Sequence, residues 1–161
     1  MGFPLEAVPT LSYGTGGRRF GAARAGGRRH AACDLIAPLN TPILAVENGV
    51  VIRGPYPFYH GADAIEVRHT HFIVRYCEIR GAAEGIGVGS QVTEGQVIAY
   101  VGRMYHDSML HFEMYSGVDG DGNPLTGQLT QRNNPPYQRR IDLIDPTPYL
   151  DAWAQLLGQG E

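Results

Sequence analysis

Glycine and proline interrupt this chain so often that only short apolar runs remain between them. The 161 residues include 22 glycines and 11 prolines, which are spread along the whole length. Short apolar runs separated by such residues are typical of strands joined by turns. The pattern therefore predicts an all-β, mainly antiparallel fold. Because 43% of the residues are hydrophobic, a chain of this length can bury a core of its own.

Several of these runs have the composition of β-strands. Residues 43–52 read as two strands around an Asn48-Gly49 hairpin turn, because this dipeptide accepts positive φ at both turn positions. The β-branched and aromatic runs 64–68 and 72–79 are expected to pair, with His69-Thr70-His71 as the turn between them. Further strands are expected within residues 88–102 and 110–115.

The C-terminal end carries helix signals. Residues 119–140 form a stretch rich in Gly, Pro, Asn and Gln and are expected to be a loop. Thr147 then fits an N-cap, Pro148 the first turn, and Gly158 a position beyond the helix end. We therefore expect a single domain over residues 1–161, with a β core at about 13–115 and a loop and short helix within 116–161.

The overall charge argues against some classes of partner. The net charge is −3 and the isoelectric point is about 6.0, which speaks against a general nucleic-acid binder. No apolar run reaches the roughly 20 residues of a membrane span, and the N-terminus lacks a signal-peptide pattern. We expect a monomer made in the cytoplasm, without nucleic-acid or membrane partners. One Gly-rich stretch nevertheless concentrates five arginines, namely Arg18, Arg19, Arg24, Arg28 and Arg29.

Three residues have the chemistry of a zinc site. His30 and Asp34 lie four residues apart in HAACD, and His111 lies in LHFE. Imidazole and carboxylate are standard zinc ligands, and three protein ligands with one open position are the catalytic pattern. The spacing of one histidine and one aspartate is a weak indication by itself.

The two cysteines are expected to act as small core residues. If Asp34 faces a metal from a strand, its neighbour Cys33 points to the opposite face and toward the core. The same alternation places Tyr76 and Glu78 on one face and Cys77 on the other. The sequence leaves open whether the cysteines pair.

The order of the motifs resembles a known family. RRHAACDLIAPLNTPILAVENGVV, RYCEI, VTEGQVIAYVG and LHFE follow one another as in the lysostaphin-type zinc endopeptidases of bacterial cell-wall turnover, over about residues 13–115. The resemblance implies a β-sandwich or groove domain, with a zinc groove across one sheet face. His30 and Asp34 match the family's His-x-x-x-Asp ligands, and His111 matches the second histidine of its His-x-His motif. The implied partners are the stem peptides of bacterial peptidoglycan, whose carboxylates the arginine-rich stretch would meet.

Two departures from the family concern catalysis. Met109 stands where the family has the first histidine of His-x-His, and Glu78 stands where it has a second catalytic histidine. A thioether moves no proton, whereas a carboxylate can act as a general base toward water in a metallopeptidase. Glu78 is therefore the first catalytic candidate. His106, just before Met109, is the second, although it also fits a solvated loop histidine.

The remaining histidines are expected to lie away from the zinc. His69 and His71 also form a His-x-His, but the pairing of the flanking strands places both at a hairpin tip. In the resembled family this turn lies away from the metal. His60 lies in a Pro-rich loop and is expected to be exposed.

Two functions remain open from the sequence. The first is a zinc endopeptidase that cuts peptide cross-links in peptidoglycan, with Glu78 as base. The second is a zinc-containing binding module that has lost catalysis. The first is favoured because Glu78 is a chemically competent replacement and the ligand triad is complete. Either function requires delivery out of the cytoplasm, by a phage particle or lysis system or as cargo of a secretion machine.

Overall fold

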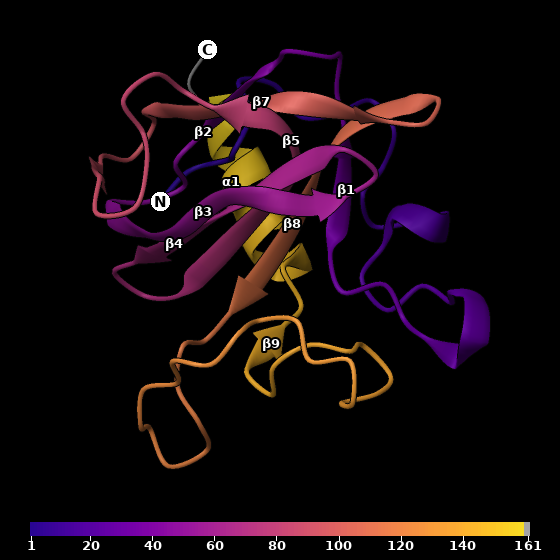
Figure 1. The fold of residues 1–161 in the computed structure, drawn as a ribbon. Helices are drawn as coiled ribbons and strands as arrows, with labels where there is room; N and C mark the ends of the chain where they lie inside the picture. Colours follow the sequence, from indigo (N-terminus) through magenta and orange to yellow (C-terminus); the bar gives the residue numbers. More distant parts are fainter. Residues whose placement is uncertain (160–161) are drawn as a thin grey trace.

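The strands of the protein form one antiparallel sheet that curls into a half-barrel (Figure 1). The computed structural model describes residues 1–159, so the end of the expected domain, 160–161, lies outside the described residues. Within residues 1–159 every strand pairing is antiparallel, and the sheet order is β1-β8-β7-β5-β4-β3-β6. The strands are β1 (Cys33–Ile36), β2 (Pro42–Leu44), β3 (Gly49–Tyr59), β4 (Ala62–His69), β5 (Ile73–Ala82), β6 (Gln91–Val92), β7 (Val97–Met104), β8 (Asp107–Tyr115) and β9 (Leu143–Ile144). Two short 3-10 helices (Gly16–Arg18 and Ala25–Gly27) precede β1, and one α-helix, α1 (Thr147–Gln159), ends the described chain.

The pairing expected between residues 64–68 and 72–79 is confirmed, but the expected hairpin at Asn48-Gly49 is wrong. The former two segments form β4 and β5, which pair directly. In the described sheet, by contrast, β2 pairs with β7, while β3 pairs with β4 and β6. Gly49 lies inside β3, where a Cβ atom would come within 2.6 Å of the Arg68 carbonyl oxygen. This glycine therefore allows a close approach of two strands rather than a tight turn.

The helix α1 closes the hydrophobic core against one face of the sheet. Leu150 and Trp153 are buried in the same cluster as Tyr76 of β5 and Phe112 of β8. The Trp153 ring lies 6.3 Å from the Phe112 ring in an edge-to-face arrangement. Burial of each such side chain contributes about 1.5–3 kcal/mol. The helix is therefore held by its apolar face, and the opposite sheet face is left for polar side chains.

The ends of α1 differ slightly from expectation. The helix begins at Thr147, and Asp145 Oδ1 accepts a hydrogen bond from the Thr147 N–H at 2.9 Å. The Thr147 hydroxyl instead contacts Cys33 Sγ at 3.3 Å. Gly158 lies inside the helix rather than beyond it. Among residues 1–159 no helix is both long and apolar enough to cross a membrane.

A β-bulge at Glu78 breaks the alternation of β5, so the predicted faces of this strand are wrong. Glu78 has φ 62°, and it is the extra residue between two pairs, Cys77 with Ala64 and Ile79 with Asp63. Tyr76 therefore points into the core, while Cys77 lies opposite His111 on the polar face. Cys33 is in the core as expected. Both cysteines are buried and free.

Candidate metal centre

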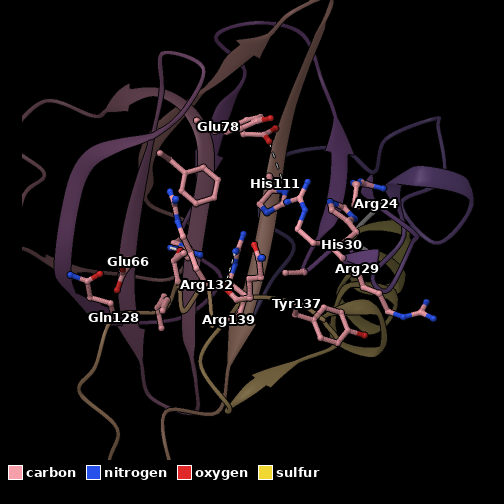
Figure 2. A pocket seen from close by; sticks show the side chains of 18 of the residues that line it. Arg24, Arg29, His30, Glu66, Glu78, His111, Gln128, Arg132, Tyr137 and Arg139 are labelled. Carbon is pink, nitrogen blue, oxygen red and sulfur yellow. Dashed lines mark hydrogen bonds and ion pairs between the residues drawn. The ribbon is translucent and has the colours of Figure 1, made fainter. Parts of the chain in front are cut away.

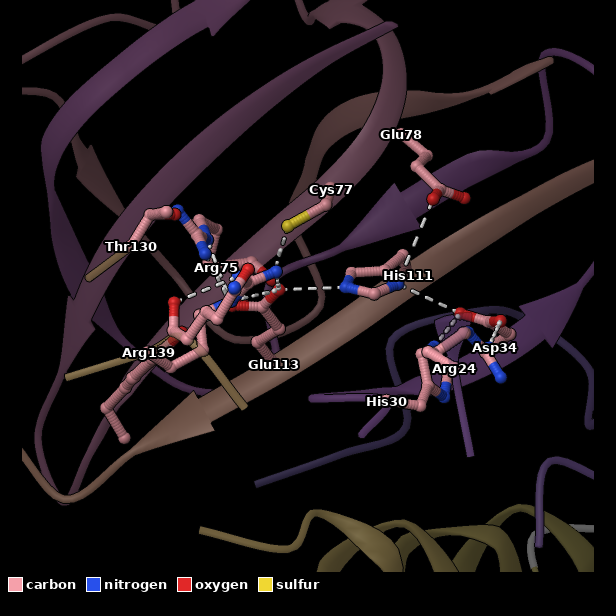
Figure 3. A network of polar contacts seen from close by, with 12 residues as sticks. Arg24, His30, Asp34, Arg75, Cys77, Glu78, His111, Glu113, Thr130 and Arg139 are labelled. Carbon is pink, nitrogen blue, oxygen red and sulfur yellow. Dashed lines mark hydrogen bonds and ion pairs between the residues drawn. The ribbon is translucent and has the colours of Figure 1, made fainter. Parts of the chain in front are cut away.

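His30, Asp34 and His111 meet at one point on the polar face of the sheet. Asp34 of β1 and His111 of β8 are direct cross-strand partners, and His30 lies in the segment just before β1. Asp34 Oδ1 lies 3.1 Å from His30 Nε2 and 3.0 Å from His111 Nδ1 (Figure 3). All three side chains are buried, and their donor atoms lie within 4.8 Å of one another. The structure thus brings together the three residues that the sequence singled out.

The donor chemistry of this cluster fits zinc. Two imidazole nitrogens and one carboxylate oxygen form the usual ligand set of catalytic zinc sites. His30 Nδ1 lies 2.9 Å from the Arg19 carbonyl oxygen, and His111 Nε2 lies 2.8 Å from Glu113 Oε2. Such partners on the second ring nitrogen hold ligating histidines in one orientation. The ring nitrogens that face Asp34 are therefore the ones available to a metal.

The cluster holds a strong charge pair when no cation is bound. Burial alone would raise the pKa of Asp34, but the hydrogen bonds from His111 and His30 outweigh it and hold that pKa well below its usual range. Burial would lower the pKa of His111, yet Asp34 and Glu113 raise it to about 10. A proton on His111 thus occupies a position that a bound metal would take, so metal uptake would release it.

Glu113 anchors this cluster to a buried network. Its carboxylate is fully buried and accepts hydrogen bonds from Arg75 (2.8 and 3.0 Å), Arg139 (3.1 Å), His111 and Tyr115. Burial would raise the pKa of Glu113, but the charges of Arg75 and Arg139 hold it well below the usual range. Sequence reasoning missed this residue. The signal was present, because Glu113 lies two residues after His111 on one strand and so shares its face.

Cys77 lies beside His111 and Glu113 but does not complete a second ligand set. The three side chains are close enough to surround an ion. Burial, followed by the negative charge of Glu113, raises the pKa of the Cys77 thiol well above its usual value. A protonated thiol is a poor metal ligand, and Glu113 is already occupied by two arginines.

Glu78 lies next to the metal-ligand cluster with one oxygen unused. Its Oε1 is 3.9 Å from His111 Nδ1, and its Oε2 is buried without a hydrogen-bond partner among residues 1–159. Burial raises the pKa of Glu78 to about 7. The backbone here packs tightly on Gly102, where a Cβ atom would come within 2.6 Å of the Glu78 carbonyl oxygen. The bulge thus holds a carboxylate of nearly neutral pKa beside His111.

The other histidines do not reach this cluster. His106 is exposed in the turn between β7 and β8 and is not among the residues that line the groove described below. His60 is exposed as expected. His71 lies at the β4–β5 turn and contacts Glu47 at 2.8 Å, whereas His69 is not at an exposed tip. It is buried at the end of β4, with Nε2 2.9 Å from the Tyr76 hydroxyl, because β4 includes His69 and the turn lies one residue later than expected, at residues 70–72.

A groove of about 990 Å³ lies over the cluster and is rich in arginine (Figure 2). Its walls come from the segment before β1 and the loop after β8, and its floor comes from the sheet. Seven arginines and three carboxylates line it, so its field favours anionic ligands. The arginines are Arg24, Arg28, Arg29, Arg53, Arg75, Arg132 and Arg139, and the carboxylates are Asp34, Glu66 and Glu78.

Sequence comparison relates this site to known peptidases. Residues 28–125 match the family described as Peptidase family M23. Over 106 residues the chain is 29% identical to Peptidoglycan DD-endopeptidase ShyC of Vibrio cholerae serotype O1. That alignment covers 65% of this chain and 24% of the relative, so the chain corresponds to only a part of that protein.

Comparison of structures confirms the lysostaphin-type fold predicted from the sequence. The antimicrobial peptidase lysostaphin from Staphylococcus simulans superposes with a TM-score of 0.67 at 18% identity, over 96% of this chain and 56% of that chain. A zinc containing peptidase from Vibrio cholerae superposes with a TM-score of 0.53 at 22% identity, over 76% of this chain and 37% of that chain. The shared architecture is a mostly antiparallel, curled sheet with one short C-terminal helix.

Proposed function

Since the chain belongs to peptidase family M23, we propose that it is a zinc-dependent endopeptidase that cleaves peptide cross-links of bacterial peptidoglycan. The observation that carries the proposal is the convergence of His30, Asp34 and His111 on the floor of an open groove, next to Glu78, whose Oε2 has no hydrogen-bond partner among residues 1–159. Three ligands at the floor of a groove leave room for substrate, which a purely structural metal does not require.

Each part of the groove has a role in this proposal. Zinc held by His30, Asp34 and His111 would polarise the scissile carbonyl and lower the pKa of water. Glu78 takes the proton of the attacking water on its carboxylate and passes it to the leaving amine. The groove arginines hold the carboxylates of the stem peptides. Met109 supplies neither acid nor base.

We expect Glu78→Gln to keep zinc and substrate binding while turnover falls about 10²-fold or more, because the amide keeps the size of the side chain but takes up no proton. The measurement is the decrease in peptide cross-links of isolated sacculi, with zinc determined on the same preparation. Glu84→Gln is the matched control, since Glu84 is exposed and outside the residues that line the groove. If wild type cuts no cross-links and still sediments with sacculi, the binding module is the correct function instead.

The second variant restores an imidazole. Met109 lies two residues before His111 on β8, so Met109→His places a ring on the same sheet face. We expect turnover to rise, by up to about 10²-fold if the imidazole acts as a general acid. The decrease in peptide cross-links of isolated sacculi measures the change. A Met109→Gln variant, which adds polarity but no proton-transfer group, should leave turnover unchanged, and an equal gain in both variants would argue against acid catalysis.

A further inference from the structure

The proposed reaction places negative charge on the carbonyl oxygen of the cleaved peptide bond. A fixed cation or N–H group aimed at that oxygen lowers the barrier, because the charge grows as water adds to the carbonyl carbon. Glu78 accepts a proton in this step and Met109 supplies none, so neither residue serves as the donor. Among residues 1–159, the histidines that line the groove are His30 and His111, which both belong to the candidate metal centre. A side-chain donor therefore has to come from elsewhere in the groove.

Arg24 is the groove arginine that lies against the candidate metal centre. Its Nη2 is 3.9 Å from Asp34 Oδ2, whereas Asp34 Oδ1 faces His30 and His111. Figure 3 shows Arg24 beside Asp34 on one side of the centre and Glu78 on the other. Within residues 1–159, no other arginine forms an ion pair with Asp34. The proposed base and this cation thus flank the three candidate ligands.

The backbone holds the Arg24 guanidinium in place. Nη2 donates a hydrogen bond to the Gly17 carbonyl oxygen at 2.7 Å, and Nη1 donates to the Ala23 carbonyl oxygen at 3.3 Å. A guanidinium has more N–H donors than these contacts use, and 32% of the side chain is exposed. Arg24 therefore combines a fixed position with donors that remain open to a ligand in the groove.

From this placement we propose that Arg24 is a second catalytic residue, which donates a hydrogen bond to the carbonyl oxygen of the cleaved peptide bond. The water oxygen forms a bond to the carbonyl carbon, the π pair of the carbonyl moves onto its oxygen, and Glu78 takes the water proton. Arg24 keeps its own proton and stabilises the new negative charge. A carboxylate of a stem peptide fits this place less well, because it would lie beside the negative charge of Asp34. The inference rests on the proposed function, because it concerns the same reaction.

The first test separates catalysis from substrate binding. The substrate is a soluble peptide dimer with one cross-link, purified from sacculi. We expect Arg24→Gln to lower kcat about 10²-fold with little change in KM, because the donor acts mainly in the transition state. Arg24→Lys keeps the charge and should lose less. Arg103→Gln is the matched control, since Arg103 is exposed and outside the residues that line the groove, and it should keep wild-type kinetics. A rise in KM with unchanged kcat would overturn the proposal, because Arg24 would then only bind substrate.

The second test needs no turnover. All proteins carry Glu78→Gln and zinc, and calorimetry gives Kd for the intact dimer and for a dimer in which a phosphinate replaces the cross-link's peptide bond. The phosphinate oxygens imitate the charged carbonyl oxygen, so we expect Arg24→Gln to weaken binding of this analogue about 10²-fold. Binding of the intact dimer should hardly change. Equal preference for the analogue with and without Arg24 would overturn the proposal.

Zinc affinity distinguishes this role from a purely structural one. If Arg24 only orients Asp34, Arg24→Gln should weaken zinc binding about tenfold or more. We expect zinc to bind at least as tightly as in wild type, because the variant removes a positive charge near a ligand. Failure of the proposed function has a different signature, in which wild type cuts no dimer and shows no preference for the phosphinate. If wild type cuts the dimer and Arg24→Gln cuts it equally well, the inference about Arg24 alone is wrong.

Discussion

Removing either histidine of the candidate metal centre should leave the protein without tightly bound zinc. We expect about one zinc per chain in wild type and almost none in His30→Ala or His111→Ala after dialysis, because a site of three ligands loses most of its affinity with one of them. Turnover of sacculi should fall to background in both variants. Metal analysis by mass spectrometry, together with the number of cross-links cut in isolated sacculi, gives both values from one preparation.

The chain offers matched histidine controls for this experiment. His60 is exposed and contacts Tyr105 away from the groove floor, so His60→Ala should keep its zinc. His106→Ala should keep both zinc and turnover, because His106 lies in an exposed turn. Full zinc in His111→Ala, combined with loss of zinc in a His69→Ala, His71→Ala double variant, would show that the ligands have been chosen wrongly.

The largest loss of stability is expected from Glu113→Gln. Arg75 is almost fully buried and Arg139 mostly buried, and Glu113 is the carboxylate that pairs with both of them. Removing one partner from a buried charge network leaves uncompensated charge, which costs about 3–5 kcal/mol. The free energy of unfolding from urea titration should therefore fall by this amount, in the metal-free protein. Glu84→Gln at the surface should change it by less than about 0.5 kcal/mol.

A triple variant separates charge pairing from shape. Glu113→Leu combined with Arg75→Met and Arg139→Met replaces both ion pairs by apolar side chains, and it should recover part of the loss because such replacements are often close to neutral. If Glu113→Gln alone costs less than about 1 kcal/mol, the network contributes far less than its burial suggests.

The three residues of the candidate metal centre were predicted from the resemblance to the lysostaphin-type family, and strand pairing explains why they meet. Once β1 and β8 are adjacent, Asp34 and His111 are direct partners, and His30 is only four residues from Asp34. Glu113 was within reach of the same reasoning, since it shares the face of His111. Its partner Arg139 was not, because that residue comes from an irregular loop whose path depends on tertiary contacts.

The failures of sequence reasoning have a common physical origin. The Asn48-Gly49 dipeptide has a strong local preference for a hairpin turn. Gly49 instead lies inside β3, where the absence of a side chain allows close contact with β4. Glu78 has a positive φ, a backbone conformation that residues other than glycine rarely adopt. Its carbonyl oxygen packs closely against Gly102 at the same place. In both places long-range packing overrides the local preference, and one sequence does not reveal such packing.

The bulge at Glu78 also shows an economical way to add a functional group to a β-sheet. Because Glu78 is an extra residue in β5, Tyr76 and Ile79 both still point into the core on either side of it. For enzyme design, this means that one inserted residue can place a new acid, base or metal ligand at the groove floor. The core residues on the other face of the sheet then need no change. A library that varies position 78 would explore catalytic chemistries on this scaffold without changing the residues of the core.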